Sequence, residues 1–164
     1  MADQAHVVIR PLGRPGDLGW VVMAHGEVYS REFGWDSTFE ALVARIVADY
    51  AAHHDPAREA AWIAEIDGQR VGCIFCVKAD DATAKLRTLL VHPDGRGHRL
   101  GGQLVDNCMA FAREAGYRRM TLWTTDILGS ARQIYLDRGF QLIQEQPERQ
   151  FGADLLSQTY ETNL

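Results

Sequence analysis

The chain is predicted to fold as an α/β (α+β) domain with a mixed, mostly antiparallel sheet flanked by helices. Three observations predict it. Strand patterns follow one another without a helix from residue 60 to residue 92, and then strand and helix patterns alternate. No repeat, low-complexity tract or linker divides the 164 residues, so we expect a single domain spanning 1–164. A meander that feeds a β-α-β-α-β unit is typical of a layered fold with a mixed sheet.

Four strands and two helices are expected in the first part of the chain. Asp17 is the expected N-cap of the first helix, and Asp36 or Ser37 that of the second, because short polar side chains accept bonds from free amides at a helix start. Asp67-Gly68 lies between two strand patterns and is a hairpin signal. The expected elements are a strand at 6–12, helices at 17–33 and 37–53, and strands at 60–66, 70–78 and 83–92.

The second part of the chain alternates between the two periodicities. Leu100, Leu104, Cys108 and Phe111 fall on one helical face, and Gly116 is a typical residue just past a helix end. A second, shorter helix is expected to end before Gly139. The expected elements are helices at 100–115 and 130–138 and strands at 119–125, 140–146 and 155–163.

Composition excludes several classes of protein. A formal net charge of −5 argues against a general nucleic-acid or membrane-surface binder, because both need an excess of Lys and Arg. Residues 1–10 lack the pattern of a signal peptide, and no apolar run is long enough to span a membrane. Three cysteines do not suggest a disulfide framework, so we expect a cytoplasmic protein. Cys73 and Cys76 would point to opposite faces of a strand, and no metal site is predicted.

The most informative segment is the glycine-rich turn at 95–102, between a hydrophobic strand and an amphipathic helix. Such a turn can direct several backbone amides into one concavity at a helix N-terminus, where they favour a phosphate. Gly95 and Gly97 permit close approach, and Gly101 and Gly102 are expected to leave room for a ligand above the backbone. Basic side chains add local positive charge at Arg96, His98 and Arg99.

Three other interpretations of this turn can be compared with the sequence. A surface loop before a core helix stays open. A nucleotide-triphosphate loop is unlike the sequence, because no Gly-Lys-Ser/Thr is present. The spacing of Gly95, Gly97 and Gly101 is similar to a dinucleotide-binding turn, but the preceding strand follows a meander and Pro93 interrupts the step from strand to turn.

Two motifs in this order resemble the GCN5-related N-acetyltransferase (GNAT) superfamily. Val91-His92-Pro93 and Arg96-x-x-Arg99-x-Gly101 resemble its acetyl-CoA motif. Its second signature is matched by Ala131, Tyr135, Gly139 and Phe140. The resemblance runs from residue 7 to the C-terminus and is strongest to the acetyltransferase domain found alone or fused to MarR-type regulators. Arg99 departs from the family by replacing a glycine, and Leu128 by replacing an asparagine.

The resemblance implies acetyl-CoA as co-substrate and direct attack of an amine on the thioester. The strand around 89–91 is expected to splay from strand 119–125, exposing backbone groups to the pantetheine arm, with the Val91 N–H region holding the thioester oxygen. Tyr135 is the candidate hydrogen-bond donor to the leaving sulfur. The residues expected to bind the cofactor are Leu89, Leu90, Val91, Arg96, Gly97, His98, Arg99, Leu100, Gly101, Gly102, Ser130 and Tyr135.

The general base and the acceptor site are less well defined. Many family members carry a Glu on the central strand where this chain has Lys85-Leu86-Arg87, so His92 and Glu32 are the candidates for a catalytic base. A solvent-facing turn residue is an equally good interpretation of His92.

An acceptor pocket is expected on the first helix, where His25, Tyr29 and Glu32 share one face, with Trp123 as a further wall. A solvated helix face is the alternative. The acceptor is expected to be a small-molecule or peptide amine, and the net negative charge favours a cationic one. The missing Glu and Leu128 keep a non-catalytic acyl-CoA-binding regulatory module as the alternative function, and a homodimer stays open.

Overall fold

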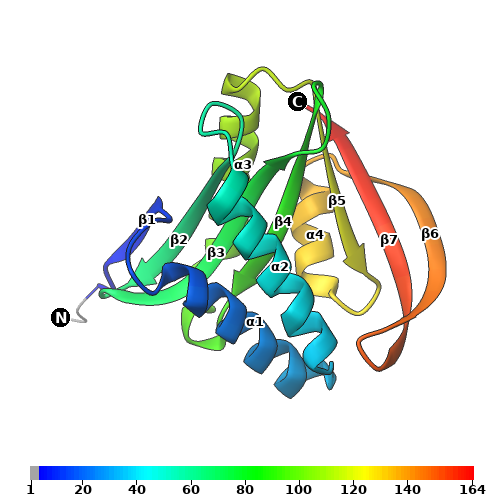
Figure 1. Ribbon diagram of the computed structural model, residues 1–164, viewed down its shortest axis with the longest axis horizontal. Helices are drawn as coiled ribbons and strands as arrows, with labels where there is room; N and C mark the ends of the chain where they lie inside the picture. Colours follow the sequence, from blue (N-terminus) through cyan, green and yellow to red (C-terminus); the bar gives the residue numbers. More distant parts are fainter. Residues whose placement is uncertain (1–3) are drawn as a thin grey trace.

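The computed structural model describes residues 4–164 and has one seven-stranded sheet (Figure 1). Residues 1–3, the start of the segment examined for a signal peptide, lie outside the described residues. The strands are β1 (Val7–Pro11), β2 (Ala60–Ile66), β3 (Gln69–Lys78), β4 (Thr83–Val91), β5 (Arg119–Thr125), β6 (Gln141–Gln150) and β7 (Ala153–Asn163). Their order in the sheet is β1-β2-β3-β4-β5-β7-β6. The predicted mixed, mostly antiparallel sheet is confirmed.

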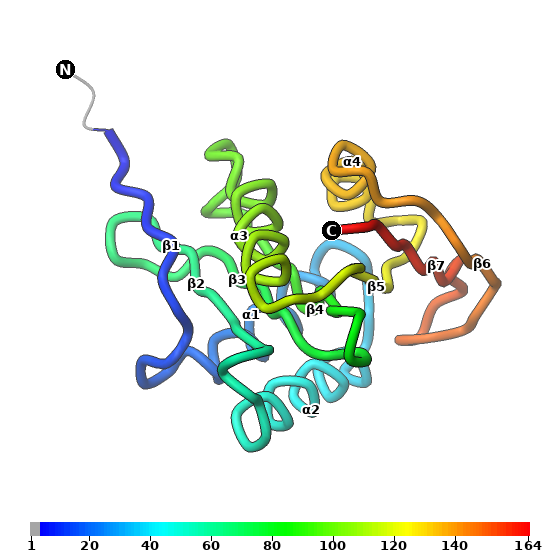
Figure 2. The backbone as a smooth tube through the Cα atoms, turned by 90° about the horizontal axis from the view of Figure 1, so that it is seen from above, coloured from blue at the N-terminus to red at the C-terminus, as the bar shows by residue number. Residues whose placement is uncertain are grey.

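Within residues 4–164, four α-helices cover the two faces of the sheet, two on each face (Figure 2). Helices α1 and α2 lie on one face and α3 and α4 on the other, so that each face has its own hydrophobic core. Cys73 belongs to the core under α1 and α2, and Cys76 to the opposite core, as the alternation of side chains along a strand predicts. The helices are α1 (Asp17–Phe33), α2 (Ser37–His53), α3 (Leu100–Glu114) and α4 (Gly129–Asp137).

The sheet opens between β4 and β5. These strands are the parallel pair, and they pair only from Thr83 opposite Arg119 to Lys85 opposite Thr121. Beyond Lys85 the ladder stops, while β5 stays paired with β7 along its whole length. The expected splay of these two strands is therefore confirmed, and it leaves the end of β4 without a sheet partner on that side.

A bulge bends β4 at the point where the splay begins. Cys73 lies opposite Leu90 and Phe75 opposite Arg87, so β4 holds one extra residue there. Thr88 has a φ of 52°, a conformation that is rare for a β-branched residue. Its carbonyl accepts a bond from Cys73 Sγ at 3.3 Å. The bulge redirects the backbone of the last β4 residues, as bulges near functional sites commonly do.

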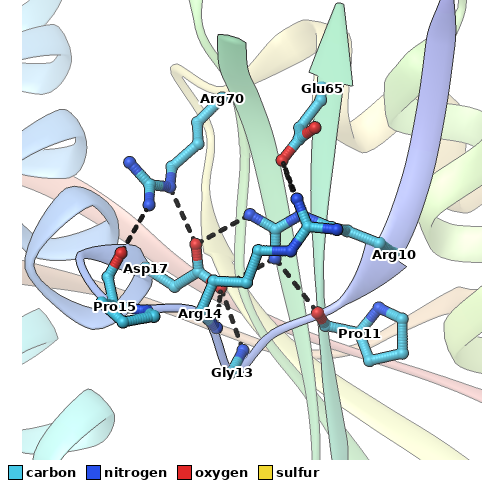
Figure 3. Close-up of polar contacts among 8 residues, drawn as sticks. All are labelled: Arg10, Pro11, Gly13, Arg14, Pro15, Asp17, Glu65 and Arg70. Atoms are coloured by element: carbon cyan, nitrogen blue, oxygen red, sulfur yellow. Dashed lines mark hydrogen bonds and ion pairs between the residues drawn. The ribbon is translucent and has the colours of Figure 1, made fainter. Parts of the chain in front are cut away.

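The prediction that Asp17 caps α1 through its side chain is wrong. Gly16 occupies the N-cap position, and Asp17 is the first helical residue, with its side chain fully buried. Its carboxylate accepts two bonds from Arg10 at 2.8 and 2.9 Å and one from Arg70 at 2.8 Å (Figure 3). The amides of Gly13 and Arg14 donate to the same carboxylate. Asp17 therefore joins β1, α1 and β3 in one ionic cluster.

The last hairpin is longer than the predicted strands 140–146 and 155–163. It extends through Pro147 to a turn at Phe151 and Gly152, both of which have positive φ. Such backbone angles are those of a tight hairpin turn whose twist matches the strands. Pro147 is compatible with β6 because this strand lies at the edge of the sheet, where an amide is not required.

Candidate functional site

Two adjoining cavities lie at the splay between β4 and β5. The inner cavity, about 340 Å³, lies between α1, α2 and the strands β4 and β5, and it reaches α4. The turn cavity, about 540 Å³, lies between the end of α1, the end of β4, the turn at 95–101 and the start of α4. Residues that line both cavities are Tyr29, Leu89, Leu128 and Ala131. Two molecules bound in the two cavities would therefore meet at these residues.

The backbone amides of residues 97–102 bond to no acceptor within residues 4–164. The first amide of α3 with a backbone partner is that of Gln103, which donates to Arg99 O at 3.3 Å. Gly97 and Arg99 both have positive φ, and such alternation turns successive amides into one concavity. This cradle of free donors at a helix N-terminus suits a diphosphate.

Arg99 occupies the N-cap position of α3 in the left-handed conformation, with φ 56° and ψ 31°. Its side chain makes no capping bond, and it is exposed. The contribution of this residue to the cradle therefore comes from its backbone. A glycine would adopt the same conformation without the steric penalty of a Cβ.

The structure gives Gly101 and Gly102 a packing role, and the room that they are expected to leave for a ligand stays a prediction. A Cβ at Gly101 would lie 2.7 Å from Ile134 Cδ1, and a Cβ at Gly102 would lie 2.7 Å from an Arg138 nitrogen. These glycines make room for α4, which packs against the start of α3. Gly95 is needed for a similar reason, because a Cβ there would lie 2.9 Å from Val71 Cβ.

Most of the residues predicted for the cofactor are brought together around the turn cavity. Its lining includes Leu89, Leu90, Val91, Arg96, Gly97, Arg99, Leu100, Gly101 and Ser130. His98 and Gly102 do not line it, although their amides belong to the cradle. Arg96 forms an ion pair with Glu32, which holds the end of α1 against the turn.

The residues predicted for the acceptor are only partly grouped. His25, Tyr29, Trp123 and Tyr135 all line the inner cavity, whereas Glu32 lines the turn cavity and is paired with Arg96. The rings of His25 and Tyr29 stack with centroids 5.8 Å apart. The shared helix face predicted for these residues therefore serves two cavities, with Tyr29 between them.

His25 is a neutral, buried histidine. Burial lowers its pKa from 6.5 to about 4, and its Nδ1 lies 2.7 Å from Val21 O. Because a carbonyl only accepts, Nδ1 carries the proton and Nε2 carries a lone pair. That Nε2 is buried and has no partner within residues 4–164.

Tyr135 lies on α4 with its side chain buried and in contact range of the inner cavity. Its hydroxyl donates to no acceptor within residues 4–164. Burial raises its pKa well above the ordinary value for a phenol, as it does for Tyr29. Both hydroxyls are therefore protonated at neutral pH and free to donate a hydrogen bond.

His92 lies apart from both cavities. Its Nδ1 accepts a bond from the Asp94 amide at 3.1 Å and caps the short 3₁₀ turn Pro93–Gly95. It lines neither cavity. The turn-residue interpretation of His92 thus agrees with its position, and the structure does not bring it to the place where an amine would react.

The inner cavity is also lined by residues that were not predicted from the sequence as part of a site, among them Lys85, Arg87 and Thr88. The two basic residues stand where many family members have a Glu, and no role is predicted for them from the sequence. Their spacing of two on a strand was the signal, since it places both side chains on one face. Nothing in the sequence marks Thr88 as the site of the bulge.

The sequence profile of the acetyltransferase (GNAT) family matches residues 22–140. This segment contains the cradle, the splayed strands β4 and β5 and most of the residues that line the two cavities. The chain belongs to the GNAT acetyltransferase family.

Known members share either sequence or fold with this GNAT chain. An uncharacterised N-acetyltransferase of Schizosaccharomyces pombe is 27% identical over 142 residues, covering 86% of each chain. N-acetyltransferase 8B of Homo sapiens is 33% identical over 85 residues, which cover 49% of this chain and 37% of that protein. The chain thus matches well under half the length of this second relative.

The solved structure of yncA from Salmonella typhimurium, with its cofactor acetyl-CoA, superposes with a TM-score of 0.76 at 15% identity. The superposition covers 96% of this chain and 94% of that one, and it shows a common fold. Within residues 4–164, no helix has the length and apolarity needed to cross a membrane. Over the same residues, no group of three or more His, Cys, Asp or Glu side chains forms a metal site.

Proposed function

We propose that this GNAT chain is an N-acetyltransferase that moves the acetyl group of acetyl-CoA to an amine by direct attack. The observation that carries the proposal is the cradle of free amides at 97–102 beside a second cavity that meets the first at Tyr29 and Leu89. Acetyl-CoA supplies a thioester carbonyl that an amine can attack. The turn cavity takes the donor and the inner cavity takes the acceptor.

The chain holds the donor mainly through its backbone. The amides of residues 97–102 bind the diphosphate, and the splayed end of β4, from Leu89 to Val91, offers unpaired backbone groups to the pantetheine arm. The Val91 N–H region is proposed to bind the thioester oxygen. Removing one donor from such an oxyanion site typically lowers the rate by about 10²–10³-fold.

Tyr135 is proposed to donate a hydrogen bond to the leaving sulfur. It is protonated and buried, and it lines the inner cavity beside Ala131, a residue that both cavities share. The resulting thiolate is stabilised without full proton transfer, because an ordinary thiol (pKa about 8.5) is more acidic than an ordinary phenol (about 10).

No carboxylate lines the inner cavity among the described residues, and its one imidazole, that of His25, is neutral and buried. We therefore propose that the amine enters in its neutral form and that no side chain acts as a strong general base. The rate should then rise with pH in step with the neutral fraction of the amine in solution.

Thermal unfolding with acetyl-CoA and a CoA-release assay with a panel of amines test the proposal. Saturation at a hundred times Kd should add about 2.7 kcal/mol to the free energy of unfolding. Stabilisation by acetyl-CoA together with turnover of at least one amine is expected. No stabilisation at millimolar acetyl-CoA would exclude the proposal, and stabilisation without any turnover would point to a non-catalytic acyl-CoA-binding module.

A cytoplasmic location, a single domain and the absence of nucleic-acid and membrane partners stay predictions.

Arg99→Gly is expected to keep the affinity for CoA within about tenfold, a change of ~1.4 kcal/mol. The backbone amide of residue 99 survives the substitution, and its left-handed conformation becomes easier to adopt. The free energy of unfolding should rise by up to about 1 kcal/mol, since a Cβ costs about 1–2 kcal/mol in this conformation. Calorimetric titration with CoA and urea unfolding measure the two effects.

Gly97→Ala is the matched control for this variant. Gly97 also has positive φ, and a Cβ there would meet no atom within 4 Å, so the substitution adds backbone strain alone. The free energy of unfolding should fall in Gly97→Ala, whereas it should rise in Arg99→Gly. Complete loss of CoA binding in Arg99→Gly would instead mean that the guanidinium grips the phosphate.

A further inference from the structure

The inner cavity contains two cations that have no partner. Lys85 and Arg87 both line it, and both are about half-buried. Neither forms an ion pair or a hydrogen bond within residues 4–164. Loss of water lowers the pKa of both side chains. Unpaired cations in a partly dry cavity are unfavourable unless another group supplies the negative charge.

The register of the sheet places both cations on the face covered by α2. Leu86, between them, belongs to the core under α3, so its two neighbours point the other way. Arg87 lies opposite Phe75, which belongs to the core under α1 and α2. Asp49 of α2 acts on Arg87 only through space, without an ion pair.

No Asp or Glu among the described residues lines this cavity. The charge on its walls is therefore positive, although the whole chain carries −5. The expectation of a cationic acceptor followed from the overall charge, and the lining of the cavity does not support it. A second cation, such as the far end of a diamine, would be repelled by Lys85 and Arg87.

We propose that the acceptor is an amine that carries an anionic group, a carboxylate or a phosphate, bound by Arg87 and Lys85. This inference rests on the proposed function, because it assigns the acceptor of the same reaction. Leu89 marks the junction of the two cavities, where the amine reacts. Along β4, Arg87 lies two positions and Lys85 four positions before Leu89, with the bulge at Thr88 between Arg87 and Leu89.

The chemistry of the remaining wall defines the middle of the acceptor. Aromatic side chains line the same cavity as the two cations, namely Tyr29, Trp35, Phe39 and Trp123. A cavity of about 340 Å³ holds a molecule of amino-acid to dipeptide size. The acceptor is therefore a short amine with an apolar spacer and an anion at its far end.

Two sets of matched amines test this specificity in the CoA-release assay. One set has a ring as spacer: para-(aminomethyl)benzoate, its carboxamide, its phosphonate analogue and the corresponding diamine. The other has an alkyl spacer: ε-aminohexanoate, its carboxamide and hexamethylenediamine. In at least one set, the anionic amine should have a kcat/KM about tenfold higher than the carboxamide. Its advantage in kcat/KM over the diamine should be larger still. The larger of the carboxylate and phosphonate rates identifies the head group.

Two variants connect the preference to the cations. In Arg87→Gln and in Lys85→Gln, the kcat/KM for the acid divided by the kcat/KM for the carboxamide should fall several-fold. Arg118→Gln is the control, since Arg118 is exposed and lines neither cavity. Calorimetric titration of the acid into the CoA-saturated protein gives a readout without turnover, and binding should weaken by about the same factor.

The outcomes separate this inference from the proposed function. If acetyl-CoA binds and amines are acetylated, but carboxamides or diamines are used as well as the acids in both sets, the acceptor assignment is wrong and the acetyltransferase stands. An unchanged acid preference in both Arg87→Gln and Lys85→Gln overturns the assignment as well. If acetyl-CoA neither binds nor reacts, the proposed function itself fails.

Discussion

Asp17→Ala is expected to lower the free energy of unfolding by about 3–5 kcal/mol, the typical effect of removing one partner of a buried ion pair. The carboxylate accepts bonds from Arg10, Arg70 and two amides of the loop before α1. Without it, Glu65, at 2.6 Å, is the one ionic partner left to the buried Arg10 among residues 4–164. Urea unfolding at neutral pH measures the effect.

The same cluster predicts how stability depends on pH. The Arg10 guanidinium holds the pKa of Asp17 well below its usual range. A depressed pKa stabilises the fold above the unfolded value of about 3.9, and the contribution is lost as the pH falls toward the folded value. The wild type should therefore lose more free energy of unfolding than Asp17→Asn when the pH falls from about 5 to about 2. Over roughly this range Asp17 becomes protonated in the unfolded chain while it stays ionised in the folded one.

Asp154→Asn is the control for the buried cluster. Asp154 pairs with Arg149 at 3.0 Å, but both side chains are largely exposed, so the change should stay below about 0.5 kcal/mol. An Asp17→Ala effect as small as this would mean that the cluster contributes little net stability. Since α1 carries His25 and Tyr29, loosening its first turn should also raise KM for the amine.

Tyr135→Phe is expected to lower kcat about a hundredfold, within the usual range for loss of a proton or hydrogen-bond donor at a reacting atom. The ring remains, so packing against Phe140 and the affinity for acetyl-CoA should change little. Because burial raises the pKa of Tyr135, the wild-type rate should not decline through ionisation of this group up to pH 10. Both effects are measured by steady-state CoA release between about pH 6 and about pH 10. This range covers roughly the ordinary pKa values of amines and phenols.

Tyr160→Phe is the matched control, because Tyr160 is a buried tyrosine on β7 that lines neither cavity. Its hydroxyl donates to Gln158 at 3.3 Å, so its loss should lower stability slightly and leave kcat unchanged. Equal kcat values for wild type and Tyr135→Phe would remove Tyr135 from the reaction. A similar loss in both variants would indicate a general effect of the missing hydroxyl on packing.

The elements and the turn were predictable because their signals are local. Apolar residues recur at every second position in strands and at every third or fourth position in helices, and glycines mark the ends. For most elements these patterns predict bounds within a few residues of those observed. Gly97 and the basic residues around it marked the cradle. The local signal failed at Asp17, where the usual preference for an N-cap was overridden by Arg10 and by Arg70, which lies 53 positions away. No local pattern contains such a partner.

The inner cavity was harder to predict because several elements build it. Lys85 and Arg87 were visible in the sequence, but their lack of partners depends on what α2, β5 and β7 bring to the same face. The bulge at Thr88 is a shift in register between β3 and β4, and no sequence pattern predicts its position. Glu32 lies on the expected face of α1, but it forms an ion pair with Arg96 of the turn and therefore lines the turn cavity instead of the inner one.

The short β4–β5 ladder divides the sheet into two antiparallel parts, β1–β4 and β5-β7-β6, joined by three register pairs. This seam has fewer register pairs than any ladder inside either part, so local opening should begin there. A ligand that touches both parts of the sheet would hold them together across the seam. Amide hydrogen exchange at the end of β5 should therefore slow on binding, although those amides lie in a strand and not in the phosphate cradle.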